Sequence, residues 1–154
     1  MHVFSLLDAA ASNPALAWPF DQAAAAHRLT ELRLAAGPLL APLLEDRRAR
    51  LLFDGIFGNS PFLSHLILRE PDFLLSLLRD GPELTMDTLQ QQLQALALED
   101  LPPAKLAWRL RGARGHAALS IALADISGYW ELGQVTAALS SFAQTLLQSA
   151  LDAQ

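Results

Sequence analysis

The sequence contains no cysteine among its 154 residues. This absence excludes disulfides, iron–sulfur clusters and zinc sites built from thiolates. Charged residues make up only 18% of the chain against 52% hydrophobic residues, which excludes disorder as the main state. The formal net charge of -5 argues against a general nucleic-acid binder. The simplest interpretation is a cytoplasmic globular protein with a core of its own.

Export and membrane signals are also missing. No cationic stretch precedes the first apolar residues, and Asp8 interrupts them early, so no signal peptide is predicted. The longest uncharged run, Leu132 to Leu151, is about long enough to span a bilayer, but polar residues interrupt it. Its apolar residues recur on one side of a helix, which predicts an amphipathic helix packed on protein and no membrane span. That apolar side consists of Leu132, Val135, Leu139, Phe142, Leu146 and Leu147.

Strand signals are nearly absent, because valine and isoleucine are scarce and no long segment alternates with period two. Residues that begin or end helices are frequent instead. The pattern predicts an all-α fold in one helical domain over residues 1–154, an irregular bundle of about seven helices. The last two helices, over about residues 104–127 and 131–151, are expected to form a long antiparallel pair.

Several boundaries follow from local chemistry. Asp21 is expected to cap the first predicted helix, and Glu45 with Asp46 is expected to open the helix that Gly58 ends. Ser60 followed by Pro61 predicts another helix start, with a capping hydroxyl before proline at the first helical position.

The next boundaries are predicted from proline and glycine. Pro71 ends one helix and starts another. Residues 80–82, Asp-Gly-Pro, predict a turn, and Thr85 or Asp87 is expected to cap a further helix through about residue 97. Trp130 lies at a helix start and is interpreted as a core anchor.

No catalytic constellation is present in the sequence. The four histidines are scattered without the spacing of a metal site, and no nucleophile elbow or phosphate-binding loop occurs. The adjacent acidic pairs at 45–46 and 99–100 are interpreted as helix ends. We therefore predict no catalytic, cofactor-binding or metal-ligating residue, and enzymatic activity of this chain by itself stays open.

Two segments stand out. Gly58 and Asn59 tolerate a left-handed backbone and precede a helix start, which predicts a sharp corner lined by phenylalanine. That corner is either packing alone or a rigid support for a contact surface. In the second segment, Arg109, Arg111 and Arg114 form a basic cluster with Lys105. The cluster is either a solvated helix face or a contact for phosphate or an acidic partner.

Both segments resemble one protein family. This sequence resembles the N-terminal helical region of the bifunctional glutamine synthetase adenylyltransferase/adenylyl-removing enzymes. The similar segments are the run from Gly55 to Leu63 with the following Leu-Arg-Glu-Pro, and the later run from Ile121 to Leu132. The resemblance covers residues 46–151, and residues 1–45 match no motif. The residues that carry it are Gly58, Asn59, Ser60, Pro61, Arg69, Pro71, Asp125, Gly128 and Trp130.

The resemblance implies a specific function for the parent enzyme. Such enzymes attach AMP from ATP to a tyrosine of glutamine synthetase and remove it by phosphorolysis, under control of a PII signalling protein. Their nucleotidyltransferase domains hold Mg²⁺ with an Asp-x-Asp pair, which this sequence lacks. We therefore expect an N-terminal fragment that precedes the first catalytic domain. Arg109, Arg111 and Arg114 are the candidate partner contacts. The alternative is a free-standing all-α interaction module.

Overall fold

The computed structural model describes residues 4–96 and 98–152, which form seven α-helices and no strand. The all-α prediction is confirmed. The helices are α1 (Ser5–Ser12), α2 (Gln22–Ala35), α3 (Arg47–Asn59), α4 (Pro61–Arg69), α5 (Pro71–Leu96), α6 (Pro103–Ile126) and α7 (Leu132–Asp152), with a short 3₁₀ helix, η1 (Ala41–Glu45), before α3. Within these residues no helix is both long and apolar enough to cross a membrane.

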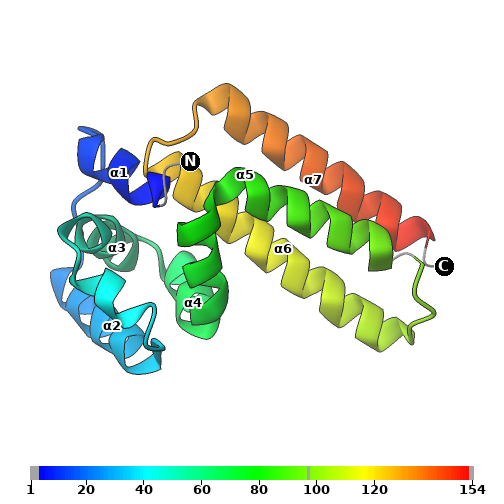
Figure 1. The fold of residues 1–154 in the computed structure, drawn as a ribbon, viewed down its shortest axis with the longest axis horizontal. Coiled ribbons are helices and arrows are strands. Elements are labelled where there is room, and N and C mark those ends of the chain that lie inside the picture. Colours follow the sequence, from blue (N-terminus) through cyan, green and yellow to red (C-terminus); the bar gives the residue numbers. More distant parts are fainter. Residues whose placement is uncertain (1–3, 97, 153–154) are drawn as a thin grey trace.

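Helices α1 to α4 gather at one end of the molecule (Figure 1). Helix α3 packs against α1, α2 and α4 and supplies much of the core there. Its fully buried Phe53 and Phe57 rings stack with centroids 5.8 Å apart. Helix α1 buries Leu6 and Leu7, although the sequence predicted no helix before Asp21. This helix is short and gains its stability from packing, which local patterns do not show.

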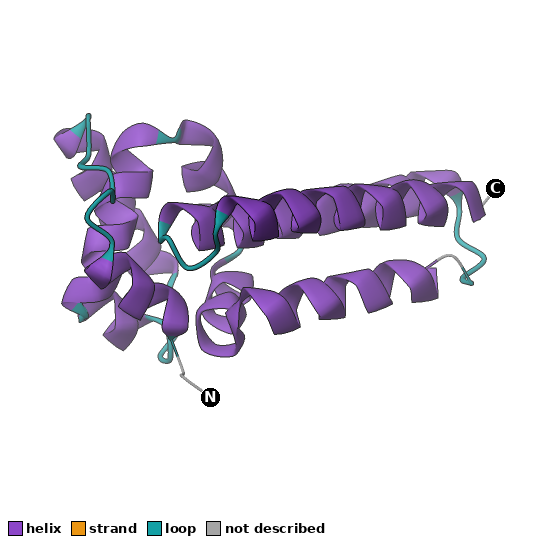
Figure 2. Ribbon diagram, turned by 90° about the horizontal axis from the view of Figure 1, so that it is seen from above, coloured by secondary structure: helices purple, strands orange, loops and turns teal. Residues whose placement is uncertain are grey.

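Helices α5, α6 and α7 extend from that end as a bundle (Figures 1 and 2). The predicted antiparallel pair of α6 and α7 is present, and the second half of α5 packs against both of its members. The pair is therefore part of a three-helix bundle.

The predicted helix starts are confirmed where the capping is local. Asp21 accepts a hydrogen bond from the amide of Ala24 at 2.8 Å, and Asp46 accepts one from the amide of Arg48 at 2.8 Å. These carboxylates satisfy amides that a helix start leaves without partners.

The predicted turn at residues 80–82 is confirmed, because two helical segments meet there at a kink within α5. The kink lies at Gly81, whose φ of 83° and ψ of 164° are not helical and are adopted readily only by glycine. Pro82 restarts the helix at once. Thr85 therefore lies inside the helix and donates to the Gly81 carbonyl, and neither it nor Asp87 is a cap.

The predicted buried side of α7 is only half correct. Val135 and Phe142 are buried, and Leu146 is half-buried. Leu132, Leu139 and Leu147 are instead 79%, 53% and 63% exposed. The apolar arc of α7 is wider than the groove between α5 and α6 can cover, so its outer leucines face solvent.

Candidate interaction site

The corner between α3 and α4 consists of one residue, Ser60. Its hydroxyl accepts a hydrogen bond from the amide of Leu63 at 3.2 Å, and Pro61 takes the first helical position. The predicted helix start is confirmed. The corner therefore joins α3 and α4 without a flexible loop.

Gly58 is needed for a different reason than the sequence indicated. The prediction that it ends the helix with a left-handed backbone is wrong, because Gly58 lies inside α3 and its φ is not positive. A Cβ atom built there would lie 2.3 Å from the Cβ of Pro19. One turn earlier, a Cβ on Gly55 would lie 2.5 Å from the carbonyl oxygen of Ala17. Both glycines therefore let residues 17–21, here called the strap, lie directly on α3.

Asn59 fixes the strap through its side chain. Its Nδ2 donates to the carbonyl of Trp18 at 2.7 Å, and its Oδ1 accepts from the amide of Phe20 at 3.1 Å. The amide of Asp21 donates to the Gly58 carbonyl at 3.1 Å. Asn59 does not take the left-handed conformation that the sequence suggested. The corner residues hold the N-terminal part of the chain in place.

The second run of resembling residues also contacts the N-terminal part. Gly128 ends α6 with a φ of 76°, as predicted, and a Cβ there would lie 3.0 Å from Nδ2 of Asn13. That amide donates to the Ile126 carbonyl at 3.1 Å. Asp125 is exposed, and its carbonyl accepts from the Gly128 amide. This run therefore anchors the end of α1 to the end of α6.

Trp130 is a core anchor, as predicted. Its side chain is buried, and its indole Nε1 donates to Oε1 of Glu83 at 2.7 Å. Glu83 lies in the second half of α5, just after the kink at Gly81. The bond therefore joins the start of α7 to α5.

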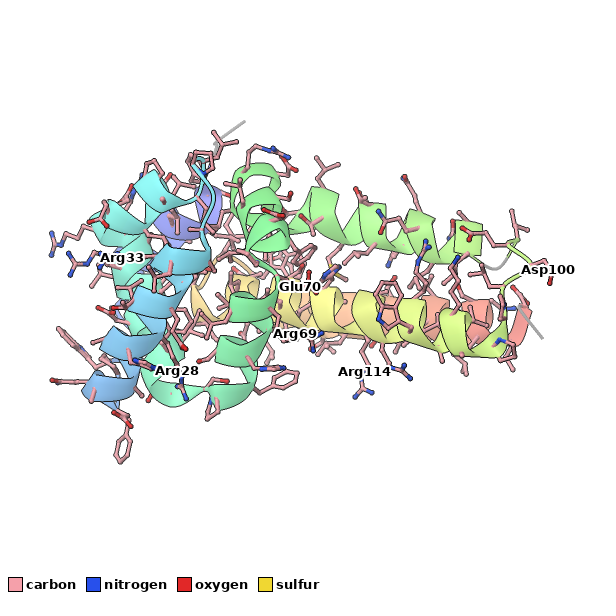
Figure 3. All side chains as sticks on the ribbon, turned by 90° about the horizontal axis from the view of Figure 1, so that it is seen from below. Arg28, Arg33, Arg69, Glu70, Asp100 and Arg114 are labelled. Atoms are coloured by element: carbon pink, nitrogen blue, oxygen red, sulfur yellow. The ribbon has the colours of Figure 1, made fainter. Side chains whose placement is uncertain are left out.

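The structure separates the three candidate contact arginines. Arg109 lies near the loop between α5 and α6, with its Nη2 4.0 Å from Oε1 of Glu99. Arg111 instead lines a hollow of about 230 Å³ between α4 and α6. Arg69, the last residue of α4, lines the same hollow. Figure 3 shows Arg69 and Arg114 on the same side of the molecule. We call Arg69, Arg111 and Arg114 the arginine face.

Within the part of the chain that the structure describes, no carboxylate lies within 4.0 Å of the guanidinium groups of the arginine face. All three side chains are exposed. The exposed indole of Trp108 borders the hollow, which gives the face an apolar centre next to its charges. Such a combination of arginine and tryptophan is common in protein interfaces.

His116 also lines the hollow and stacks on Phe73. The His116 ring lies 3.9 Å from the Phe73 ring, at an interplanar angle of 6°. Its Nε2 lies 3.5 Å from Oε2 of Glu70 without forming a hydrogen bond. Helix α6 lies close to α4 here, and a Cβ on Gly115 would make an ordinary van der Waals contact with Leu66 at 3.4 Å. The α4–α6 contact is therefore packed, and the arginine face lies on a fixed support.

Another charged cluster links α1 to α3. The Arg48 guanidinium pairs with the carboxylates of Asp46 and Asp8. Hydrogen bonds from Arg48 lower the pKa of the Asp46 carboxyl below its ordinary value. Across the described residues, no group of three or more histidine, aspartate or glutamate side chains is placed to hold a metal ion.

Comparison with known proteins decides the family. The family model described as glutamate-ammonia ligase adenylyltransferase matches residues 52–154. The chain belongs to this family. The resemblance carried by the two motif runs is therefore confirmed, and the corner and the arginine face both lie in the matched region. No solved structure matches the chain.

Curated members of the family are bifunctional glutamine synthetase adenylyltransferase/adenylyl-removing enzymes. The enzyme of Rhodopseudomonas palustris strain HaA2 is 36% identical over 75% of this chain, and that of Xanthobacter autotrophicus strain Py2 is 40% identical over 67%. The enzyme of R. palustris strain TIE-1 is 35% identical over 97% of the chain, so its similarity extends into the first 45 residues. The chain spans 12%, 10% and 16% of these relatives.

Proposed function

We propose that this chain is the N-terminal helical segment of an enzyme that attaches AMP to a tyrosine of glutamine synthetase and removes it by phosphorolysis. The family match over residues 52–154 carries this proposal. ATP and Mg²⁺ would be bound by nucleotidyltransferase domains outside these 154 residues, since the sequence has no Asp-x-Asp pair. Control by a PII protein and a cytoplasmic location belong to the same proposal.

Within that enzyme, we propose that the arginine face contacts glutamine synthetase at an acidic surface. The proposal is supported by three exposed arginines that have no acidic partner within the described residues, in a chain whose net charge is -5. An unneutralised cationic face attracts an acidic partner and raises the rate of encounter. Arg109 remains a candidate, but its nearness to Glu99 reduces the charge available for a partner.

The test replaces Arg69, Arg111 and Arg114 by alanine in the full-length enzyme that contains this segment. We expect KM for glutamine synthetase to rise roughly tenfold, because partly exposed charge contacts are lost, with little change in kcat. The difference from wild type should shrink as salt is added. Arg47→Ala, at an exposed arginine of α3 outside the face, is the matched control. An unchanged KM and affinity in the triple variant would remove the arginine face from the proposal.

The alternative is a free-standing all-α module that binds a partner without catalysis. In that case the exposed leucines of α7 would form the binding surface. An immunoblot of the source cell with an antibody against this segment separates the two. A species several times larger than 16.7 kDa supports the multidomain enzyme, and a species at that mass supports the free-standing module.

A further inference from the structure

Helix α7 presents a row of exposed leucines beside its buried side. Leu132, Leu139 and Leu147 lie 79%, 53% and 63% exposed, and Leu151 continues the row. Their spacing of seven, eight and four residues keeps them on one side of the helix. We call these four residues the leucine face. It is adjacent to the buried seam of Val135 and Phe142, so the apolar surface of α7 extends past its contact with α5 and α6.

The leucine face has no charges near it along the helix. From residue 132 to residue 151, α7 contains no aspartate, glutamate, lysine or arginine. Exposed leucines on one side of a helix, with no charge near them in the sequence, are typical of an interaction surface. Charged residues are depleted in the centres of interfaces, and permanent interfaces are more apolar than transient ones. The composition of α7 therefore indicates a permanent neighbour.

The arginine face has the opposite character. It is charged and exposed, which suits a partner that arrives and leaves. A permanent apolar contact is obtained most readily within one polypeptide. Curated relatives leave ample polypeptide for such a contact, because the aligned part of this chain covers only 10–16% of their length.

We propose that the leucine face docks intramolecularly on the domain that follows α7 in the full-length enzyme. The inference rests on the proposed function, because it requires that the segment lead a longer polypeptide. Beyond the proposed function, the inference says that the leucine face makes the contact within the enzyme. The arginine face is a different surface and is the one that contacts glutamine synthetase. Ordering α7 against a following domain would fix the bundle, and with it the arginine face, relative to that domain.

Hydroxyl-radical footprinting of the dilute full-length enzyme tests the contact without a substitution. Leu34 on α2 is the internal control, because it is 83% exposed and lies outside the α5–α7 bundle. We expect oxidation of Leu139 and Leu147 to be several-fold slower than that of Leu34. Equal oxidation of the three leucines would overturn the proposal.

Two further outcomes are informative. Protection that disappears on dilution would assign the leucine face to a second copy, and protection that appears only with glutamine synthetase would assign it to that partner. Either would overturn the intramolecular contact. Footprinting measures the accessibility of the leucine face, whereas KM of the arginine variants measures the contribution of the arginine face. The docking proposal can therefore fail while the proposed contact with glutamine synthetase stands, and the reverse. In addition, Leu139→Gln with Leu147→Gln should lower Tm of the full-length enzyme more than Leu34→Gln does.

Discussion

Asn59 and Phe20 are joined by a hydrogen bond from the Phe20 amide to the Asn59 Oδ1, 3.1 Å long, across 39 positions of sequence. The same side chain donates to the carbonyl of Trp18 at 2.7 Å. The strap is thereby fixed while its Trp18 and Phe20 side chains remain 84% and 94% exposed. A family motif at the α3–α4 corner thus positions a segment that carries no recognisable motif itself.

Asn59→Ala should release the strap. The substitution leaves the Phe20 amide and the Trp18 carbonyl without their protein partners, and because both bonds are exposed we expect a loss of about 0.5–1.5 kcal/mol in the free energy of unfolding. Hydrogen exchange of the Phe20 amide should accelerate. Thr30→Ala is the control, since that hydroxyl bonds only to its own helix. Unaltered exchange at Phe20 would show that Asn59 does not hold the strap.

Two glycine substitutions should change the free energy of unfolding in opposite directions. Gly58→Ala places a Cβ 2.3 Å from Pro19, so α3 and the strap must separate, and we expect a loss of several kcal/mol. Gly112→Ala adds a Cβ that meets nothing within 4 Å in α6 and should stabilise by up to about 1 kcal/mol. Urea unfolding measures both. Stabilisation by Gly58→Ala would contradict the close approach of the strap.

The link from Arg48 to Asp46 should make stability depend on pH in the acid range. Because the folded-state pKa of Asp46 is lowered from 3.8, its contribution is present above that value and lost as pH falls through the lower, folded pKa. Asp46→Asn should therefore cost under about 1 kcal/mol at pH 7, since the pair is partly exposed, and nothing at the lowest pH. Thermal unfolding between pH 7 and pH 2 measures this difference. The stability loss caused by Asp46→Asn should exceed that of the control Asp100→Asn in the α5–α6 loop, and it should shrink as pH falls. A loss that stays constant in acid, or one equal to that of the control, would contradict the role given to the Arg48–Asp46 pair.

The bond between Trp130 and Glu83 should contribute measurably to the α5–α7 contact. Trp130→Phe removes the donor and part of a buried side chain, and we expect a loss of about 1–3 kcal/mol. Glu83→Gln keeps an acceptor and should cost less. Chemical denaturation of both variants provides the comparison. Equal losses would mean that the carboxylate charge, and not the hydrogen bond, matters at this position.

The features predicted correctly from the sequence are those that depend on neighbouring residues. Asp21 and Ser60 were identified as caps, and Glu45 with Asp46 as a helix start, because a cap is decided within a few positions. Pro71 and Gly128 were likewise identified as a helix start and a helix end. The overall all-α class followed from composition and periodicity.

The features that were missed depend on distant parts of the chain. Gly58 is required by Pro19, which no local pattern reveals. The exposed Leu139 has the same periodicity as a buried residue, so periodicity could not tell which half of the apolar arc α5 and α6 cover. Arg69 joins Arg111 only because α4 packs on α6.

Lys105 can test the contact between the arginine face and glutamine synthetase, because it is the only lysine in the sequence and lies on α6, six positions before Arg111. The measurement is amine-reactive crosslinking with mass spectrometry on the full-length enzyme mixed with glutamine synthetase. We expect crosslinks from Lys105 to glutamine synthetase that weaken when Arg69, Arg111 and Arg114 are replaced by alanine. Crosslinks to glutamine synthetase from other parts of the enzyme, with none from Lys105, would contradict this contact.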